Sequence, residues 1–478
     1  MTATTSGTNE ARRDLPRTIG TFGALGIMLG TIIGSGIFRT PSEIAQHLSS
    51  PVVMLLMWAV GGLLSLFGAL TFTELAVVFP RSGGLYNFLY HGLGRSTAFV
   101  FGWTYMLISK PFAAGAISTI FAQYLHLNSH YAAFAVRRLG MPEGYTTVWA
   151  EPAAVCAVLI ALTALNARGM RLGAGAGVVV TSLKVAALVS MCLFAVVVPG
   201  GDAANFAPAD EVPKSLLLAL APVMAAVLWT YEGWADVGAV AGEVKDPQRT
   251  LPRVNVLGTL LAVGLYIAIN AAYFYVLPIE QVRASTSVAG DVMAKLLGPA
   301  GGVLLTAMVV VSTLGSTHAS IITGARVTFA QSQDRLLFRF LSRVHPRYET
   351  PHVSLWLQCA LSCTAVLFFR DFATLAGGFV FTIWIFYGLA AFSVIRLRVT
   401  RPELERPYRT PWYPVVPVLF ILSAVGMTVL EVVASAGRLR AGEAVWWETS
   451  LLWIVVLLAG YPVFYVWDRW WNSRPTFV

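Results

Sequence analysis

The chain has 478 residues, of which 56% are hydrophobic and 12% are charged. This composition excludes an ordinary soluble domain and indicates an integral membrane protein. The formal net charge of +9 does not indicate a nucleic-acid partner, because the basic residues lie between long apolar stretches, as they do in proteins that cross a lipid bilayer.

A helix needs about 20 apolar residues to cross the hydrocarbon core of a bilayer. The charged residues separate twelve stretches of about this length, which predict an all-α membrane protein with twelve transmembrane helices. In chain order they are residues 18–38, 44–73, 95–124, 152–167, 172–198, 215–242, 254–279, 296–325, 350–369, 372–395, 410–430 and 449–467.

The basic residues predict the orientation of these helices. Twelve spans place most of the 33 Lys and Arg residues on the same side as the N-terminal tail, which carries Arg12, Arg13 and Arg17. The positive-inside rule then predicts a multi-pass protein of the inner (plasma) membrane with both termini in the cytoplasm. No hydrophobic stretch precedes residue 18, so we expect no cleavable signal peptide.

The sequence carries no motif for catalysis or metal binding. Its four cysteines, Cys156, Cys192, Cys359 and Cys363, fall within predicted spans and lack the spacing of a zinc site. No Gly-Lys-Ser/Thr phosphate loop and no His-Glu-x-x-His motif occurs. We therefore expect no enzyme activity, no cofactor and no metal.

Glycines interrupt two of the predicted spans. In the first, "GTIIGSG" continues a ladder of Gly26, Gly30 and Gly34 that is typical of close helix packing, but Gly36 follows Ser35 directly and lies off the ladder. The sixth span, "LWTYEGWADVGAVAGE", combines glycines with acidic residues in apolar surroundings. Breaks in these two corresponding spans predict a five-plus-five inverted repeat with a binding site near the membrane midplane and two extra helices.

The inverted repeat also predicts how the chain is divided. The expected segments are a cytoplasmic tail (1–17), the first repeat (18–198), an external loop (199–213), the second repeat (214–397), a cytoplasmic loop (398–413), the last two helices (414–468) and a cytoplasmic tail (469–478).

A broken helix exposes backbone N–H and C=O groups at a depth where water is scarce, and these groups need partners. Free N–H groups can bind a carboxylate and free carbonyls can bind an ammonium, so the two breaks together describe a site for a zwitterionic amino acid. The predicted substrate-binding residues are the N–H donors Ser35, Gly36 and Ile37, the carbonyl acceptors Ile32, Trp229 and Glu232, and Gly34 and Gly233, whose missing Cβ allows close approach.

Four longer motifs carry a resemblance to a known family: "GTIIGSGIFRTP", "FTELAVVFPRSGGLYNFL", "WTYEGWADVGAVAGEVKDPQRTLPR" and "RPELERPYRTPWYPVVPVLF". They resemble the amino acid, polyamine and organocation transporter superfamily and, within it, the L-type amino acid transporters. The resemblance implies a LeuT-like fold that works by alternating access, with spans one and six unwound around the substrate. By position, Ser35 and Gly36 would bind the substrate carboxylate, and Trp229 would be the gate that shields the substrate from outside.

Two of these residues have alternative interpretations. Members of the family commonly carry Gly or Asp where this chain has Glu232, whose longer carboxyl side chain would be buried and paired or protonated, with only its carbonyl near the substrate. Trp229 would, in the alternative, pack in the core. Both alternatives stay open at the level of sequence.

Lys184 lies about 12 residues after the start of the fifth span, roughly 18 Å along the helix and near the middle of the hydrocarbon core. An ionisable residue at this depth is a functional candidate and needs acceptors, such as carbonyls freed by the break in the first span. The resemblance implies that its ammonium stands where sodium-coupled relatives hold a cation. A structural tether between helices is the alternative role.

Four further polar residues lie within spans. Lys110, before Pro111, is a candidate for the pocket or vestibule, and His318 is a candidate for the core, for the cavity wall or for proton coupling. Glu74 and Asp236 lie toward the expected cytoplasmic ends of their spans, where we expect them to pair with Arg81, Lys245 or Arg249. Cytoplasmic gating is the alternative role.

Taken together, the residues and the resemblance predict sodium-independent exchange of neutral L-amino acids. Proton-coupled symport, a carrier of cationic amino acids or polyamines, and a membrane sensor without transport are the alternatives. In the family's animal members a cysteine after span three binds a partner glycoprotein through a disulfide. Residues 126–148 contain no cysteine, so we expect no disulfide-linked heavy chain, and the expected partners are the substrate and the lipid bilayer.

Overall fold

The computed structural model describes residues 16–34, 36–208, 216–285, 287–370, 372–442, 445–446 and 449–472. Ser35, a predicted carboxylate ligand, lies outside the described residues, as do Arg12 and Arg13. All statements below concern the described part of the chain.

The described residues form an all-α structure. In chain order its helices are α1 (Thr21–Ile32), α2 (Gly36–Ala45), α3 (Pro51–Val78), α4 (Leu85–Leu93), α5 (Arg95–Thr104), the π-helical turn η1 (Tyr105–Ser109), α6 (Lys110–Tyr124), α7 (Leu127–Leu139), α8 (Ala150–Ala167), α9 (Met170–Val197), the 3₁₀ turn η2 (Ala203–Phe206), α10 (Leu216–Tyr231), the 3₁₀ helix η3 (Asp236–Glu243), α11 (Pro247–Val276), α12 (Ile279–Ala284), α13 (Val288–Leu297), α14 (Pro299–Gln333), the 3₁₀ turn η4 (Arg339–Ser342), α15 (His352–Phe369), α16 (Phe372–Thr400), α17 (Val415–Arg440) and α18 (Ser450–Asn472).

Eleven helices among the described residues are long and apolar enough to cross a membrane. Helical structure occurs at each of the twelve predicted spans, but the sixth is divided into α10, of 16 residues, and η3, of 8 residues. Neither piece alone has the length of a membrane span. The prediction of an all-α membrane protein is confirmed, whereas the number twelve and the inverted repeat stay predictions.

The structure differs from the predicted elements in the loops and at several boundaries, among them the start of α11 at Pro247, the end of α14 at Gln333 and the end of α17 at Arg440. The second long helix begins at Pro51 and not near residue 44, because Ser50 caps it by accepting a hydrogen bond from the N–H of Val53 and proline suits the first helical position. Four helices, α4, α7, α12 and α13, lie between the predicted spans. They are shorter than a membrane span, so a search for apolar stretches of that length does not find them.

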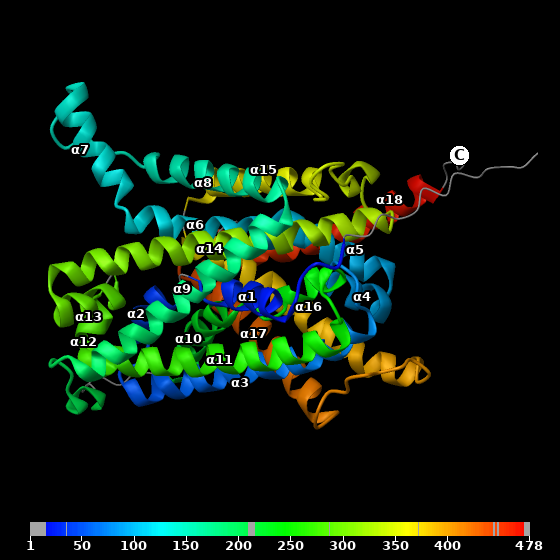
Figure 1. Cartoon of the computed structure of the whole chain (residues 1–478), viewed down its shortest axis with the longest axis horizontal. Coiled ribbons are helices and arrows are strands. Elements are labelled where there is room, and N and C mark those ends of the chain that lie inside the picture. Colours follow the sequence, from blue (N-terminus) through cyan, green and yellow to red (C-terminus); the bar gives the residue numbers. More distant parts are fainter. Residues whose placement is uncertain are drawn as a thin grey trace, which may run out of the picture.

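The long helices run along the long axis of the molecule, and α1 lies near its centre (Figure 1). The short helices α7, α12 and α13 gather at one end, while α4 lies toward the opposite end (Figure 1). On the predicted topology the first group lies outside the cell and α4 lies in the cytoplasm.

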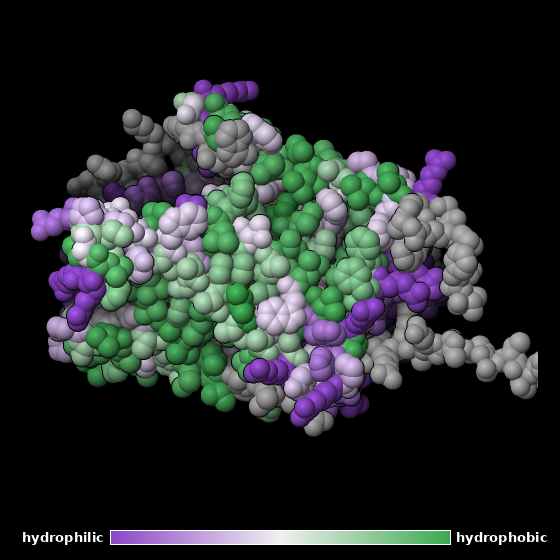
Figure 2. Space-filling view, turned by 90° about the horizontal axis from the view of Figure 1, so that it is seen from above, coloured by the Kyte–Doolittle hydropathy of each residue, from purple (hydrophilic) through white to green (hydrophobic). Residues whose placement is uncertain are grey.

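The outer surface is apolar between these two ends. Figure 2 shows hydrophobic side chains over the middle of the visible face, with hydrophilic residues gathered toward its ends. Large apolar side chains on three different long helices, Leu56, Val196 and Leu422, are 55%, 77% and 61% exposed. A long helix that is apolar on its outer as well as its inner face is typical of a membrane span, where the outer face contacts lipid.

Buried aromatic residues hold the end of α10 in place. The ring of Trp58 on α3 lies edge-on to Tyr231 and to Tyr266, with ring centroids 5.7 Å apart in both pairs. Tyr231 is the last residue of α10 and Tyr266 belongs to α11. Each such pair contributes about 0.5–1.5 kcal/mol beyond the burial of its area, so the point where α10 stops is fixed by its neighbours.

The two acids near the expected cytoplasmic side do not have the partners that we predicted. Glu74 pairs with Arg398 at 2.6 Å and lies 3.6 Å from Arg406, and Asp236 pairs with Lys110. The prediction that they pair with Arg81, Lys245 or Arg249 is wrong, because the basic residues that face them come from parts of the chain distant in sequence: α6, α16 and the loop that follows α16.

Candidate functional site

The first break follows α1. The helix ends at Ile32, and the N–H of Gly34 bonds back to the carbonyl of Ile32 at 2.7 Å in a tight turn. The chain resumes as α2 at Gly36. The N–H groups of Gly36 and Ile37, in the first turn of α2, have no acceptor within the helix, and a helix N-terminus favours an anion.

The glycine ladder of the first span serves two purposes. A Cβ on Gly26 or Gly30 would lie 2.9 Å from Val178 or 2.8 Å from Thr181, both on α9, so these two glycines allow close helix packing. A Cβ on Gly34 would have no neighbour nearer than 3.8 Å. The packing interpretation therefore holds for Gly26 and Gly30, whereas Gly34 lines a small cavity.

The second break separates α10 from η3. Between them, Gly233 adopts a φ of +121°, a conformation that glycine reaches without strain. The carbonyl of Gly233 accepts a hydrogen bond from the N–H of Asp236 at 3.1 Å. The continuous α-helical hydrogen-bond pattern is therefore lost at Gly233, which leaves neighbouring backbone groups without helical partners.

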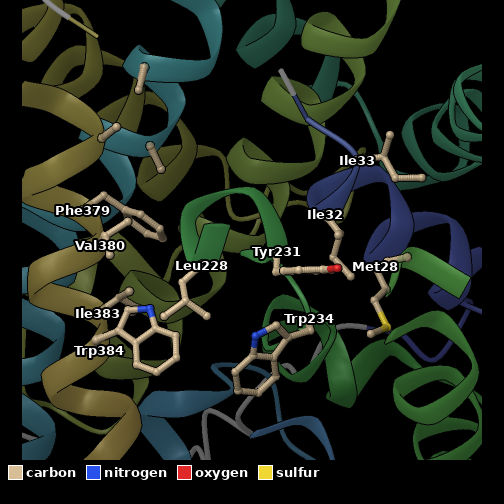
Figure 3. Close-up of a cluster of buried hydrophobic side chains, with 14 of the residues drawn as sticks. Met28, Ile32, Ile33, Leu228, Tyr231, Trp234, Phe379, Val380, Ile383 and Trp384 are labelled. Carbon is tan, nitrogen blue, oxygen red and sulfur yellow. The ribbon is translucent and has the colours of Figure 1, made fainter. Parts of the chain in front are cut away.

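The two breaks are in direct contact. The hydroxyl of Thr31, which also faces the carbonyls of Ile27 and Met28 in its own helix, lies 3.2 Å from the carbonyl oxygen of Gly233. A Cβ on Gly233 would lie 2.8 Å from the backbone nitrogen of Ile32. In Figure 3, Tyr231 at the end of α10 points toward Ile32 and Met28 of α1. Segments about 200 residues apart thus meet as the sequence predicted, near the centre of the molecule (Figure 1).

A small cavity of about 40 Å³ lies between the breaks. Among its lining residues are Ile32, Gly34, Gly36, Trp229, Glu232 and Gly233. Of the predicted substrate-binding residues in the described part of the chain, Ile37 alone does not line it. The cavity wall also carries four hydroxyl groups, from Thr31, Thr230, Ser316 and Ser320, and apolar groups from Ala113, Ile117 and Phe379.

The predicted carbonyl acceptors differ in how many lone pairs they still have free for a substrate ammonium. The carbonyl of Ile32 accepts a hydrogen bond from the hydroxyl of Tyr266 at 2.7 Å as well as the bond from Gly34, which fills both lone pairs. A substrate ammonium at Ile32 would have to displace one of these donors. Within the described part of the chain, the carbonyl of Trp229 accepts only from the N–H of Glu232, at 3.1 Å, and has a second lone pair for a ligand.

Lys184 is buried on α9 and is bound to the end of α1. Its ammonium donates to the carbonyls of Gly30 at 3.1 Å and Ile33 at 2.8 Å and to the hydroxyl of Ser316 at 2.7 Å. The three N–H groups of a lysine thus each have an acceptor. The side chain occupies the position that the sequence predicted, beside carbonyls freed by the first break.

Trp229 lies at the centre of an aromatic cluster beside the cavity. Its ring contacts Phe372 and Phe379 of α16 edge-on, with centroids 5.8 Å and 5.5 Å apart. The guanidinium of Arg39 lies over Phe372, 4.9 Å from the ring centre. Figure 3 shows Phe379 on α16, across the α10 segment from Ile32. Trp229 thus both packs and lines the cavity, so the two interpretations of this residue are compatible.

Lys110 and Asp236 form a buried ion pair at the cavity wall. Lys110 Nζ lies 2.6 Å from Asp236 Oδ2, and the side chains are 5% and 12% exposed. The hydroxyl of Thr323 on α14 donates to the same carboxylate oxygen at 3.1 Å. Lys110 follows the π-helical turn η1, a deviation from regular helix that occurs often at functional sites. The prediction placed Lys110 in the pocket or vestibule, and the structure places it in the pocket.

Glu232 points its carboxylate at α16. Its Oε1 accepts a short hydrogen bond from the hydroxyl of Tyr387, and the residue is only partly buried because it lines the cavity. His318 lies buried in α14 and does not line the cavity. The alternative of a paired Glu232 side chain is therefore the arrangement seen, and the residue lines the cavity.

Several residues of the site were not predicted from the sequence. Tyr266, Ser316, Phe379, Tyr387 and Thr323 all come from helices without any break or charge motif. A tyrosine or serine in an apolar helix is too common to single out, and only the packing of α11, α14 and α16 around the breaks brings these side chains together. Ser316 and Phe379 line the cavity, and the other three contact residues that line it. Alternating polar residues along residues 312–332 of α14 were the one available signal, because such residues line a protein interior in membranes.

Comparisons with known proteins agree with this geometry. The sequence pattern of the family described as amino acid permease matches residues 19–459. The chain is 30% identical over 458 residues to a serine/threonine exchanger of Bacillus subtilis (strain 168), across 94% of this chain and 97% of that protein. It is 28% identical over 437 residues to the b(0,+)-type amino acid transporter 1 of Mus musculus (90% and 85%) and 28% identical over 469 residues to the cystine/glutamate transporter of Homo sapiens (96% and 87%).

Proposed function

The chain belongs to the amino acid permease family, whose members are membrane transporters and not enzymes, and from this membership we propose that it exchanges small neutral L-amino acids without sodium. The observation that carries the proposal is the contact between the two broken helices, made by Thr31, Ile32 and Gly233. Backbone groups of both helix ends face one small cavity, and a zwitterion supplies the two opposite charges that such groups bind.

The arrangement suggests how each end of the substrate is bound. The N–H groups of Gly36 and Ile37, with Ser35, would hold the carboxylate at the start of α2. The carbonyls of Trp229 and Glu232, and that of Ile32 once a donor is displaced, would accept hydrogen bonds from the ammonium. Each end of the substrate would then be bound by several backbone groups, because one helix terminus stabilises an ion by at most about 2 kcal/mol.

The size and the polarity of the cavity support a small side chain. Its volume is about 40 Å³, and a cavity needs at least about 10–15 Å³ for each water that it holds. Four hydroxyl groups line the wall, so a short polar side chain would find hydrogen-bond partners. The similarity to a serine/threonine exchanger supports the same substrate class.

Lys184 supports the proposal that sodium is not required. Its ammonium already donates to Gly30, Ile33 and Ser316, which are oxygen ligands of the kind that would hold a cation. A fixed ammonium at this position would stand in for a bound cation. Trp229 would close the cavity on its outer side in the course of alternating access.

Counterflow in proteoliposomes tests the proposal. Purified protein would be reconstituted with unlabelled L-serine inside, and uptake of labelled L-serine would be followed with and without sodium and with and without a pH gradient. We expect uptake that needs internal amino acid and is indifferent to sodium. Uptake that proceeds without internal amino acid and stops when the proton gradient is removed would instead establish proton-coupled symport. Binding without any uptake would establish a sensor.

The second candidate function is a carrier of cationic amino acids, and the position of Glu232 is the observation that favours it. This residue lines the cavity and its carboxylate could bind a distal ammonium or guanidinium, and one relative is a b(0,+)-type transporter. The variant Glu232→Gln distinguishes the two candidates. Loss of L-lysine transport in this variant, from a protein that never transports L-serine, would establish the second candidate.

We also propose that the protein lies in the plasma membrane with both termini in the cytoplasm and without a disulfide-linked heavy chain. The loop between α6 and α8 that would carry the bridging cysteine contains none. Electrophoresis of the protein from native membranes should show the same mobility with and without reductant, and tags at either terminus should be inaccessible in intact cells.

A further inference from the structure

Three ionisable side chains line the cavity in the described part of the chain: Lys110, Glu232 and Asp236. Lys110 and Asp236 form the 2.6 Å ion pair, whereas Glu232 accepts from the neutral hydroxyl of Tyr387. Because these opposite charges are so close, their electric fields largely cancel at longer distances from the pair. The cavity therefore holds one cation whose charge is neutralised before any substrate enters.

Both partners of the pair are held in place by rigid elements. Asp236 begins η3, where its N–H bonds to the carbonyl of Gly233 and its carboxylate accepts from Thr323 of α14. Lys110 begins α6, with its ammonium 5.7 Å from the centre of the Tyr105 ring. From the sequence we expect Asp236 to pair with Arg81, Lys245 or Arg249, whereas the structure pairs it with Lys110.

We propose that Asp236 sets the charge selectivity of the cavity by neutralising Lys110, so that amino acids with an acidic side chain are rejected. The inference rests on the proposed function, in which helix ends already bind the substrate's own ammonium and carboxylate. A second carboxylate on the substrate would need an unpaired cation, because an unpaired buried charge is strongly unfavourable. Lys110 is the one cation lining the cavity among the described residues, and Asp236 occupies it.

Two substitutions should shift selectivity in opposite directions. Asp236→Asn keeps the shape of the side chain and frees the charge of Lys110, so L-glutamate and L-aspartate should gain affinity. Lys110→Gln removes the counter-charge of Asp236, so L-lysine should gain affinity. The double variant Asp236→Asn/Lys110→Gln removes both charges and should reject L-glutamate again.

Competition for labelled L-serine counterflow measures these shifts. For each variant the concentrations of L-glutamate, L-lysine and unlabelled L-serine that halve uptake would be determined. Relative to L-serine, we expect L-glutamate to become at least tenfold more effective in Asp236→Asn and L-lysine at least tenfold more effective in Lys110→Gln. Glu280→Gln, which removes one acid from the exposed helix α12, should leave the pattern unchanged.

The outcomes separate this inference from the proposed function. If the unaltered protein exchanges L-serine but neither substitution changes the order of the competitors, or both favour the same charge, the inference is overturned and the proposed function stands. If the unaltered protein neither binds nor exchanges any neutral amino acid, the proposed function itself fails. Melting temperatures would be recorded for every variant. Should one single variant not fold, the other decides, and should both fail, acceptance of L-glutamate by the double variant would overturn the inference.

Discussion

Lys184 shows how a charged residue can stay in the interior of a membrane protein. An ammonium at this depth is tolerated only with enough acceptors, and the break after α1 supplies two carbonyls while α14 supplies the Ser316 hydroxyl. Hydrogen bonds to a charged group contribute about 1.5–3 kcal/mol each. The lysine and the break therefore stabilise one another, and the proposed role of cation substitute is compatible with that of a structural tether.

Replacing this ammonium should impair transport more than a comparable change elsewhere. Lys184→Met keeps the apolar stem but removes the three donors, so we expect L-serine counterflow to fall at least tenfold and the melting temperature to fall. Lys295→Met is the matched control, since Lys295 donates to a single carbonyl, that of Val276, the last residue of α11. Normal counterflow in Lys184→Met would contradict the role given to this residue.

Trp229 should contribute through its ring and not through its indole N–H. Two edge-on contacts, with Phe372 and Phe379, are worth about 0.5–1.5 kcal/mol each. We expect Trp229→Ala to weaken apparent affinity for L-serine about tenfold, which corresponds to about 1.4 kcal/mol, and Trp229→Phe to retain most of it.

The control for this prediction is Trp412→Ala, because Trp412 is 75% exposed and remote from the cavity. Saturation curves of counterflow would give the apparent affinities. Equal curves for Trp229→Ala and the unaltered protein would show that the aromatic cluster does not close over the substrate.

At the scale of single elements, the two broken helices depend on each other. The turn after α10 needs a residue without a side chain, both because Gly233 has a positive φ and because a Cβ would meet the backbone of Ile32 and Thr31. The last turn of α1 in turn places the hydroxyl of Thr31 3.2 Å from the carbonyl oxygen of Gly233. Neither break would persist in the membrane without the partner that satisfies its backbone groups.

A substitution at Gly233 should therefore damage both fold and function. Gly233→Ala introduces a side chain into a conformation that costs about 1–3 kcal/mol and adds a clash with α1. We expect a lower melting temperature and no measurable counterflow. Gly264→Ala is the matched control, because a Cβ there meets no atom within 4 Å and alanine is favoured over glycine inside a helix by about 0.5–1 kcal/mol. A loss of stability at Gly264 similar to that at Gly233 would refute this explanation.

At the scale of the whole molecule, the expected cytoplasmic end is closed by contacts that join distant parts of the chain. Ile19, just before α1, forms a parallel bridge with Val244 after η3. The neighbouring Glu243 binds Arg326 of α14 through both carboxylate oxygens, at 2.9 Å and 3.2 Å, and these side chains are 2% and 1% exposed. The ends of the two broken helices are thereby tied to each other and to α14 below the cavity.

Breaking this buried pair should lower stability far more than breaking an exposed one. Glu243→Gln leaves Arg326 buried without a counter-charge, and removing one partner of such a pair costs about 3–5 kcal/mol. Glu431→Gln is the control, since Glu431 and Arg438 form a 3.5 Å pair whose side chains are 32% and 48% exposed, and exposed pairs contribute about 0–1 kcal/mol. Thermal melting of the two variants in detergent compares them.

The double variant Glu243→Gln/Arg326→Met completes this comparison. It removes the unpaired charge together with its partner, so we expect it to recover much of the melting temperature that Glu243→Gln loses. A double variant less stable than the single one would show that the arginine stabilises this end through its stem and its bond to the carbonyl of Ile322 and not through the ion pair.

The sequence by itself determined the class of protein, the positions of the long helices and the places where two of them stop. These are local properties. Apolar length marks a membrane helix wherever it lies in the fold, and the glycines at Gly34, Gly36 and Gly233 mark breaks because they weaken helix at that point. Lys184 was identifiable for the same reason, since a lone charge within an apolar span needs acceptors in any arrangement.

Only the tertiary structure decided which groups meet. Lys110 and Asp236 are 126 residues apart, and Glu74 and Arg398 are 324 apart; their pairing depends on how the helices turn and slide against each other. The same rotation and sliding of the helices bring the hydroxyl of Tyr266 to the carbonyl of Ile32 and the ring of Phe379 against that of Trp229. Local pattern does not contain this information, because every helix offers several faces and the packing of all its neighbours selects the one that lines the cavity.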